Sequence, residues 1–118
     1  MGTDRRQPTP EILRGTFDML ILRALTWGPA HGYAVARWIH DTSGDELVVE
    51  DRALYVALHR MEERGWVESA WGTSEKGKRA KFYSLTAAGR RALRAEQTSW
   101  ERYVEAVARV MTATPQPA

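Results

Sequence analysis

The chain has 118 residues, and none of them is cysteine. This absence excludes disulfides, thiolate metal sites, iron–sulfur clusters, thiol nucleophiles and redox sensing through thiols. The sequence also has no apolar run near the ~20 residues that cross a bilayer, and its start, MGTDRRQPTP, has no hydrophobic signal segment. We therefore expect a cytoplasmic protein without a membrane partner.

Acidic residues are scarce in one region, although the net charge of the chain is only +2. Residues 51–91 contain nine basic and five acidic side chains, whereas residues 1–50 contain five and seven. Between Lys76 and Arg91 there are six basic residues and no acidic one. Such a cluster attracts phosphates. A solvated basic loop would carry the same charges, so both interpretations stay open on charge alone.

Two helices are predicted in the first part of the chain. Thr9 followed by Pro10 is typical of a helix start, and the apolar spacing that follows predicts a helix over residues 10–27. A second helix is predicted over residues 32–43, where apolar side chains recur at helical spacing before a glycine. We expect His31, directly before this helix, to cap it or to pack against it.

A helix and a hairpin are predicted in the middle of the chain. Residues 47–49 are predicted to form a brief extended segment, and residues 51–64 a third helix with Asp51 as its N-cap. Two β-like stretches follow, residues 66–71 and 80–85, separated by a segment that contains glycine and lysine. This order predicts a hairpin with a basic tip.

Thr86 is predicted to cap a final long helix. The order of elements indicates a mainly α fold with a small β-hairpin. We interpret residues 10–85 as a winged helix-turn-helix DNA-binding domain and residues 86–112 as a C-terminal dimerisation helix. Residues 1–9 and 113–118 are expected to be a disordered N-terminal segment and a disordered tail.

The third predicted helix and the hairpin tip are the candidate DNA-binding elements. Apolar residues on one helix face would hold the helix against the core, and the other faces would meet base edges or phosphates. The hairpin tip would neutralise phosphates, which positions a protein without specifying bases. Tyr55 has a second interpretation, packing at the hairpin junction. The candidate DNA-binding residues are Arg52, Tyr55, His59, Arg60, Lys76, Lys78, Arg79 and Lys81.

The last predicted helix carries an apolar stripe that predicts a homodimer, because so small a monomer would leave much of it exposed. A two-fold symmetric dimer predicts a pseudo-palindromic operator. Trp100 is either an anchor of the interface or one wall of a slot for a flat aromatic ligand, and both interpretations stay open. The candidate dimerisation residues are Leu93, Trp100, Val104, Val107 and Met111.

The chain resembles the PadR family of transcriptional regulators, particularly its short members with a single C-terminal helix. The resemblance spans nearly the whole chain and rests on the order and spacing of several segments. These are residues 13–22 (LRGTFDMLIL), 28–33 (GPAHGY), 54–62 (LYVALHRME), Trp71-Gly72, 79–86 (RAKFYSLT), Ala88-Gly89 and Trp100.

The resemblance implies a dimeric winged-helix repressor that a small compound, often aromatic or cytotoxic, releases from DNA. It also implies control of the protein's own gene or of a neighbouring transporter or detoxification gene. By the same resemblance Tyr55 and its helix neighbours contact DNA, residues 76–81 form the wing, and Trp100 lines a ligand pore at the dimer centre. The chain departs from the family pattern at Arg52-Ala53 and at Val56, where members often have Gly-Thr and Pro, so its operator preference should differ.

Three other classes of protein fit the sequence less well. His31, His40 and His59 lie on different predicted segments without a recognisable nucleophile, metal spacing or phosphate-binding loop, so we expect no enzyme, no cofactor and no metal. The lack of cysteine argues against a metal-sensing winged helix. A winged-helix protein-interaction module without specific operator binding remains the alternative, although the basic wing argues against it.

Overall fold

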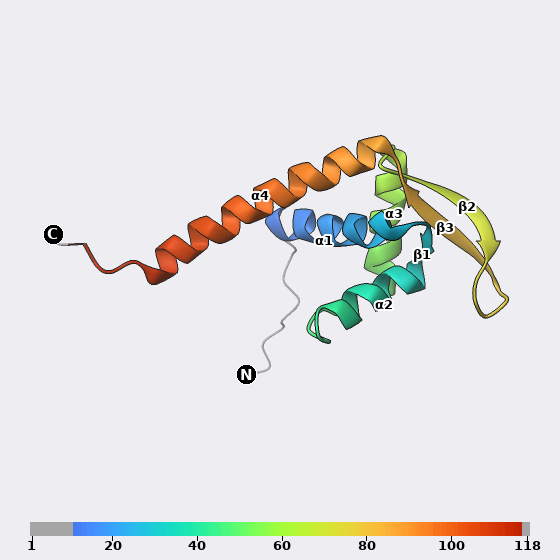
Figure 1. The fold of residues 1–118 in the computed structure, drawn as a ribbon, viewed down its shortest axis with the longest axis horizontal. Coiled ribbons are helices and arrows are strands. Elements are labelled where there is room, and N and C mark those ends of the chain that lie inside the picture. Colours follow the sequence, from blue (N-terminus) through green and yellow to red (C-terminus); the bar gives the residue numbers. More distant parts are fainter. Residues whose placement is uncertain (1–10, 117–118) are drawn as a thin grey trace.

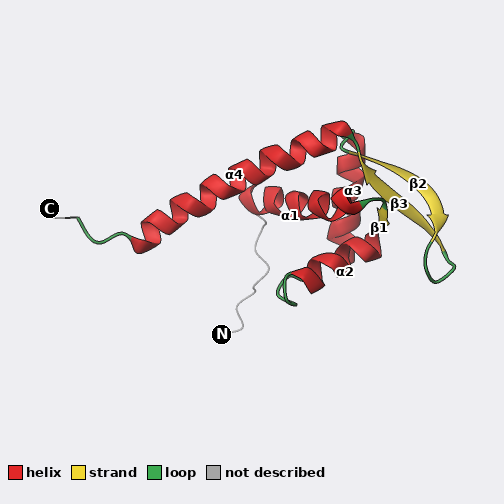
Figure 2. Cartoon of the chain, in the orientation of Figure 1, coloured by secondary structure: helices red, strands yellow, loops and turns green. Residues whose placement is uncertain are grey.

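The computed structural model describes residues 11–116, with side chains from residue 15 onward. Three shorter helices gather around the chain's core, a hairpin extends on one side, and a long helix leaves in the opposite direction (Figures 1 and 2). The elements in chain order are α1 (Glu11–Ala24), the short 3-10 helix η1 (Leu25–Trp27), β1 (Ala30–His31), α2 (Gly32–Thr42), α3 (Asp51–Glu63), β2 (Val67–Thr73), β3 (Arg79–Leu85) and α4 (Ala87–Thr112). The predicted mainly α fold with a small hairpin is therefore confirmed.

The core lies between the first three helices and the inner side of the hairpin. α3 contributes Leu54, Leu58 and Met61, which are completely buried as the helical spacing predicted. α1 contributes Ile21 and Leu22, which are also completely buried. Burial of these side chains fixes which face of α3 turns inward and leaves the opposite face in solvent.

The sheet has three strands in the order β1-β3-β2, one more than the sequence predicted. β1 is only two residues long, too short for an alternating pattern, and it pairs antiparallel with β3. His31 lies in this strand opposite Phe82, with 5.3 Å between the ring centroids. Its Nδ1 also accepts a hydrogen bond from the Ala34 N–H at 3.2 Å, so the predicted cap of α2 is confirmed.

Two predicted boundaries differ in the structure. α1 changes at Ala24 to the short η1 helix, which ends before Gly28 at φ 130°. Residues 47–49, predicted as a brief extended segment, form neither a helix nor a strand; Val48 is 80% exposed, whereas Val49 packs against the core. The N-cap of α3 is Glu50, and Asp51 occupies the first turn, where its charge suits the helix dipole. The predicted cap at Thr9 lies outside the described residues.

α4 begins at a tightly built junction. Thr86 caps it as predicted: its Oγ1 accepts from the Gly89 N–H at 3.0 Å and donates to the Gly65 carbonyl at 2.6 Å. A Cβ at Gly89 would collide with the Trp66 carbonyl oxygen, so glycine permits this close packing. The helix then runs along α1, and its C-terminal half projects beyond the three-helix unit (Figure 1).

Residues 113–116 form neither helix nor strand, while the predicted disorder of residues 1–9 and the last part of the predicted tail fall outside the described residues. No helix within residues 11–116 is long and apolar enough to cross a membrane.

Glu96 lies where α4 packs on α1, with its carboxylate above Gly15. Burial raises the pKa of the Glu96 carboxyl, and repulsion from Asp18 adds to the rise, while Arg64 opposes it. A raised folded-state pKa contributes stability below the ordinary value of 4.5, and this contribution is lost as the pH rises through the folded value. Above that range the folded protein holds a carboxylate that is partly removed from water.

Glu96→Gln should therefore raise the free energy of unfolding at pH 8 and change it little at pH 4. Urea unfolding followed by circular dichroism at pH 4, 6 and 8 measures this difference. Glu101→Gln, in the exposed part of the same helix, is the matched control and should not reproduce it. Equal effects of Glu96→Gln at all three pH values would contradict the argument.

Candidate nucleic-acid interface

The outward face of α3 presents four side chains within two helical turns. Arg52, Tyr55, Val56 and His59 are all exposed, and their spacing places them on one side of the helix. Tyr55 is 48% exposed and the His59 side chain 73%. Arg52 makes no ion pair with any described residue, so its guanidinium is available to an external partner.

Arg60 was predicted to lie on this face, and that expectation is wrong. Its guanidinium turns back to Asp18 of α1, with Nη1–Oδ2 and Nη2–Oδ1 distances of 2.7 and 2.9 Å. The Asp18 side chain is 5% exposed and the Arg60 side chain 25%. The hydrogen bonds to Asp18 raise the pKa of Arg60, although burial opposes the shift. Arg60 therefore holds α3 against α1 and is not free to contact DNA.

Tyr55 packs against α2 and remains partly exposed. Its ring packs so closely on the first residue of α2, Gly32, that a Cβ there would lie 2.5 Å from the phenol oxygen. About half of the side chain nevertheless remains exposed. Tyr55 thus joins α3 to α2 while its outer part lies at the surface.

The hairpin turn between β2 and β3 carries the predicted wing cations. Gly77 adopts φ 77°, a left-handed conformation that favours glycine, and the turn is closed by a hydrogen bond of 2.7 Å from the Ser74 N–H to the Lys78 carbonyl. Lys76 and Lys78 are exposed, and neither ammonium group has an ion-pair partner among residues 11–116. These two lysines are therefore free to meet phosphates.

The other two wing cations are held by neighbours. The Arg79 guanidinium lies 4.7 Å from the centroid of the Trp71 ring across the hairpin, and Trp71 is itself 61% exposed. Lys81 Nζ lies 3.9 Å from a carboxylate oxygen of Glu62 on α3. Ser69 donates a 2.6 Å hydrogen bond to the same carboxylate. The two contacts with Glu62 orient the hairpin relative to α3.

A groove between α2 and the hairpin brings most of the candidate residues together. Tyr55 and the four wing cations line it, together with Tyr33 and Arg37 of α2. Its charged lining has five cationic and two acidic side chains, so an excess of positive charge faces the groove. Arg52 and His59, which lie one helical turn before and one after Tyr55 on α3, are not part of its lining.

The sequence patterns did not identify Arg37, because the apolar spacing of α2 indicates only how this helix packs. It lies one helical turn after Tyr33, whose hydroxyl accepts a 3.4 Å hydrogen bond from its Nη1. Its side chain is 64% exposed. The signal that identifies it is the i, i+4 pairing of two polar side chains on the face of α2 opposite its apolar stripe.

α4 exposes an apolar face beyond the three-helix unit. Its predicted members Trp100, Val104, Val107 and Met111 are 36–76% exposed. Leu93 differs, because it is only 7% exposed and belongs to the chain's own core. The prediction that Leu93 faces a second copy is therefore wrong. The exposed apolar face of α4 consists of Trp100, Tyr103, Val104, Val107, Val110 and Met111.

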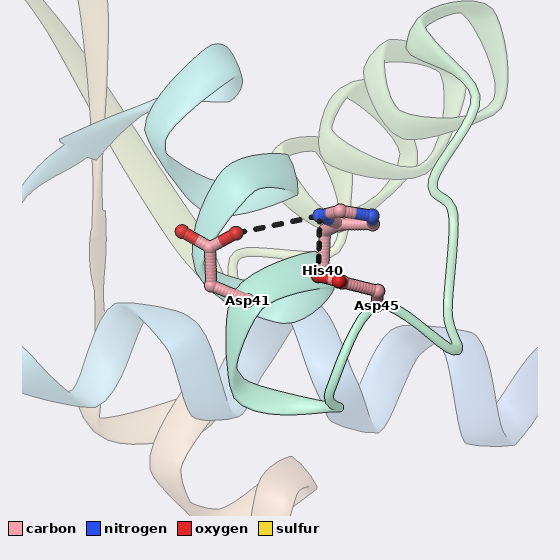
Figure 3. Close-up of side chains that lie close together, drawn as sticks. All are labelled: His40, Asp41 and Asp45. Carbon is pink, nitrogen blue, oxygen red and sulfur yellow. Dashed lines mark hydrogen bonds and ion pairs between the residues drawn. The ribbon is translucent and has the colours of Figure 1, made fainter.

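A separate polar cluster lies at the end of α2, where His40 stands between Asp41 and Asp45 (Figure 3). Its Nδ1 lies 3.3 Å from Asp41 Oδ1 and 3.6 Å from Asp45 Oδ1, and Arg37 also pairs with Asp41 at 3.5 Å. The Asp45 N–H donates to the His40 carbonyl at 2.9 Å. These mutual contacts close the helix end and account for the arrangement, so we assign no metal to it.

Comparison with known proteins supports a regulatory role. A family model described as the transcriptional regulator PadR-like family matches residues 21–95. A solved transcriptional regulator from Clostridium thermocellum is similar, with a TM-score of 0.76 and 26% identity over 85% of this chain and 97% of that one. A PadR family transcriptional regulator from Eggerthella lenta has a TM-score of 0.73 and 31% identity over 86% of each chain. An uncharacterized protein of Lysinibacillus sphaericus is 25% identical over 97 residues, 82% of this chain and 89% of its own length.

Proposed function

Because the chain belongs to the PadR-like family of transcriptional regulators, we propose that it represses transcription by binding a pseudo-palindromic operator as a homodimer, and that a small aromatic ligand releases it. The observation that carries the proposal is the groove that Tyr55 of α3 shares with the wing cations. Members of the family are regulators and not enzymes, which agrees with the lack of a catalytic motif in the sequence.

Two elements divide the contacts with DNA. α3 enters the major groove with its outward face, where the donors of Arg52 and His59 reach base edges. The hairpin lies along the phosphate backbone, where Lys76 and Lys78 neutralise charge and Arg79 is held in place by Trp71. Arg37 adds a cation from α2 on the same side. Specificity then comes mainly from α3, and the wing contributes affinity at many sequences.

The homodimer is proposed from the exposed apolar face of α4. Three of its members, Trp100, Val104 and Val107, are spaced so that they form one continuous stripe. A stripe of this kind is costly in water, and a two-fold symmetric partner would cover it with an identical stripe. Such a dimer places two copies of α3 on one side of DNA, which calls for an operator with two related half-sites.

The ligand site is proposed at the same interface. The Trp100 and Tyr103 rings lie 6.1 Å apart with an interplanar angle of 38°, and both are partly exposed. Two copies of this pair facing each other would offer aromatic surfaces to a flat aromatic molecule. Its binding would change how the two copies of α4 pack and hence the spacing of the two recognition helices.

Operator binding is tested by selecting bound sequences from a pool of random duplexes and then measuring fluorescence anisotropy. DNA from upstream of the protein's own gene is included. We expect one pseudo-palindromic sequence to be enriched and to resist unlabelled competitor, with an affinity that falls steeply as salt rises. Equally weak binding to every duplex would contradict the proposal and favour a protein-interaction module.

The wing's role is tested by Lys76→Ala/Lys78→Ala. Each lost phosphate contact should reduce the magnitude of the slope of log affinity against log salt by about 0.9. Because two lysines are replaced in each wing, the magnitude of the slope should fall by about 1.8 for every wing that contacts DNA. At 0.1 M salt this corresponds to roughly a 60-fold loss of affinity for each wing. Arg90→Ala/Arg91→Ala removes the same charge from exposed positions outside the groove and is the matched control. An unchanged salt slope in the wing variant would mean that these lysines do not contact the DNA phosphates.

A further inference from the structure

One apolar side chain stands on the otherwise polar outward face of α3. Val56 is 61% exposed. It belongs neither to the hydrophobic core nor to the partly buried side chains that pack against the core. The residues that anchor α3 are Leu54, Ala57, Leu58 and Met61, all at most 2% exposed. The fold therefore gives no reason for valine at position 56.

Local helix preferences give no reason for it either. A β-branched side chain loses rotamer freedom in a helix, and at an exposed position no burial offsets that loss. Alanine, glutamate or lysine suits such a position better. Val56 thus contributes nothing to the packing of the isolated protein, and its exposed side chain is available to an apolar group outside the chain.

The neighbours of Val56 narrow the identity of that group. Arg52 lies four residues before it and His59 three residues after it, so each is one helical turn away on the same face. Tyr55, directly beside it, is 48% exposed. A protein partner of this face would have to bury a single aliphatic group inside a ring of hydrogen-bonding side chains. The edges of DNA bases offer that mixture of donors, acceptors and an isolated apolar group.

We propose that Val56 contacts the C5 methyl group of a thymine in the major groove of the operator, and so selects thymine at one position of each half-site. This inference rests on the proposed function. Thymine carries the one methyl group that the four unmodified bases present in the major groove, while their other contact points there are polar. The Val56 side chain packs against that methyl group. Arg52, which lies one helical turn away on α3, reaches hydrogen-bonding groups on the edges of the bases.

Replacement of single thymines by deoxyuridine provides the test, because it removes the methyl group and leaves base pairing intact. The duplex is the operator obtained by selection, and affinity is measured by anisotropy. We expect one thymine in each half-site at which uracil lowers wild-type affinity about fourfold, the effect of losing one buried methyl. Substitution in both half-sites should lower it about 15-fold.

Val56→Ala should bind the thymine and uracil duplexes equally, and its helix should persist because alanine is the best helix former. Val48→Ala makes the same change at a valine that is 80% exposed and lies outside α3, outside the groove lining and outside the exposed apolar face of α4, and it should keep the wild-type discrimination. The comparison uses the ratio of the two affinities, so a change in overall affinity does not affect it.

Two results would overturn the inference while leaving operator binding intact. In the first, the wild-type protein tolerates uracil at every thymine of the operator. In the second, Val56→Ala discriminates thymine from uracil as strongly as the wild type does. Failure of the wild-type protein to enrich any sequence would instead overturn the proposed function, and this inference with it.

Discussion

Arg60→Met is expected to lower the free energy of unfolding by about 3 kcal/mol. The substitution removes both hydrogen bonds to Asp18, whose side chain is only 5% exposed, and leaves its carboxylate without a compensating charge. Removing one partner of a buried ion pair costs more free energy than the intact pair contributes, because the charge that remains is buried with neither a partner nor its hydration. Urea unfolding followed by circular dichroism measures the loss.

Two further variants separate this effect from a general loss of an arginine. Arg52→Met changes an exposed arginine of the same helix and should alter stability by no more than about 0.5 kcal/mol. Asp18→Asn/Arg60→Met removes both charges and should cost less than the sum of the two single substitutions. A loss below about 1 kcal/mol in Arg60→Met would mean that the pair behaves as an exposed one, against our interpretation.

The ion pair between Asp18 and Arg60 is a feature that the sequence did not predict. Helical spacing correctly separated the buried residues of α3 from its exposed face, and it placed Arg60 beside that face. Asp18 lies 42 residues earlier in the chain, and only the packing of α1 across α3 brings the two side chains together. A periodic pattern assigns a residue to a side of its own helix and does not identify what lies on that side.

Leu93 was misplaced for a related reason. Its seven-residue spacing to Trp100 is real, and both belong to one apolar stripe. The first turns of α4, however, cross α1 and the hairpin junction, which bury Leu93 within the chain. The exposed part begins only where α4 projects past the three-helix unit (Figure 1). Periodicity predicted the stripe but not the point where the chain ceases to cover it.

Most local signals were more reliable, because they depend on neighbouring residues, although the N-cap of α3 is Glu50 and not the predicted Asp51. The caps at His31 and Thr86 were predicted from the chain immediately around them and are present as hydrogen bonds. The basic wing was predicted from a dense local cluster of charge. The two-residue strand β1 gave no such signal, since it exists only through its pairing with β3.

Val107→Glu is expected to dissociate the proposed homodimer and thereby abolish tight operator binding. Val107 is 39% exposed in the middle of the exposed apolar face of α4, and two-fold symmetry would bring two new carboxylates into that interface. Loss of apolar contact together with burial of charge should raise the dimer dissociation constant at least about 100-fold, which corresponds to about 3 kcal/mol. Sedimentation over a range of protein concentrations measures the dissociation, and anisotropy measures the operator affinity.

The matched control is Thr98→Glu, which adds the same charge to an exposed position on the opposite side of α4. Both variants should keep the helix, since glutamate is a good helix former, so a difference between them reports on the face and not on the fold. Because one recognition helix alone holds only half of a pseudo-palindromic site, the loss of the dimer should appear as a loss of affinity for the whole operator. If Val107→Glu stays dimeric, the partner surface lies elsewhere on the chain. If it becomes monomeric and still binds the whole operator tightly, recognition does not require two copies, and the proposed coupling between α4 and the operator is wrong.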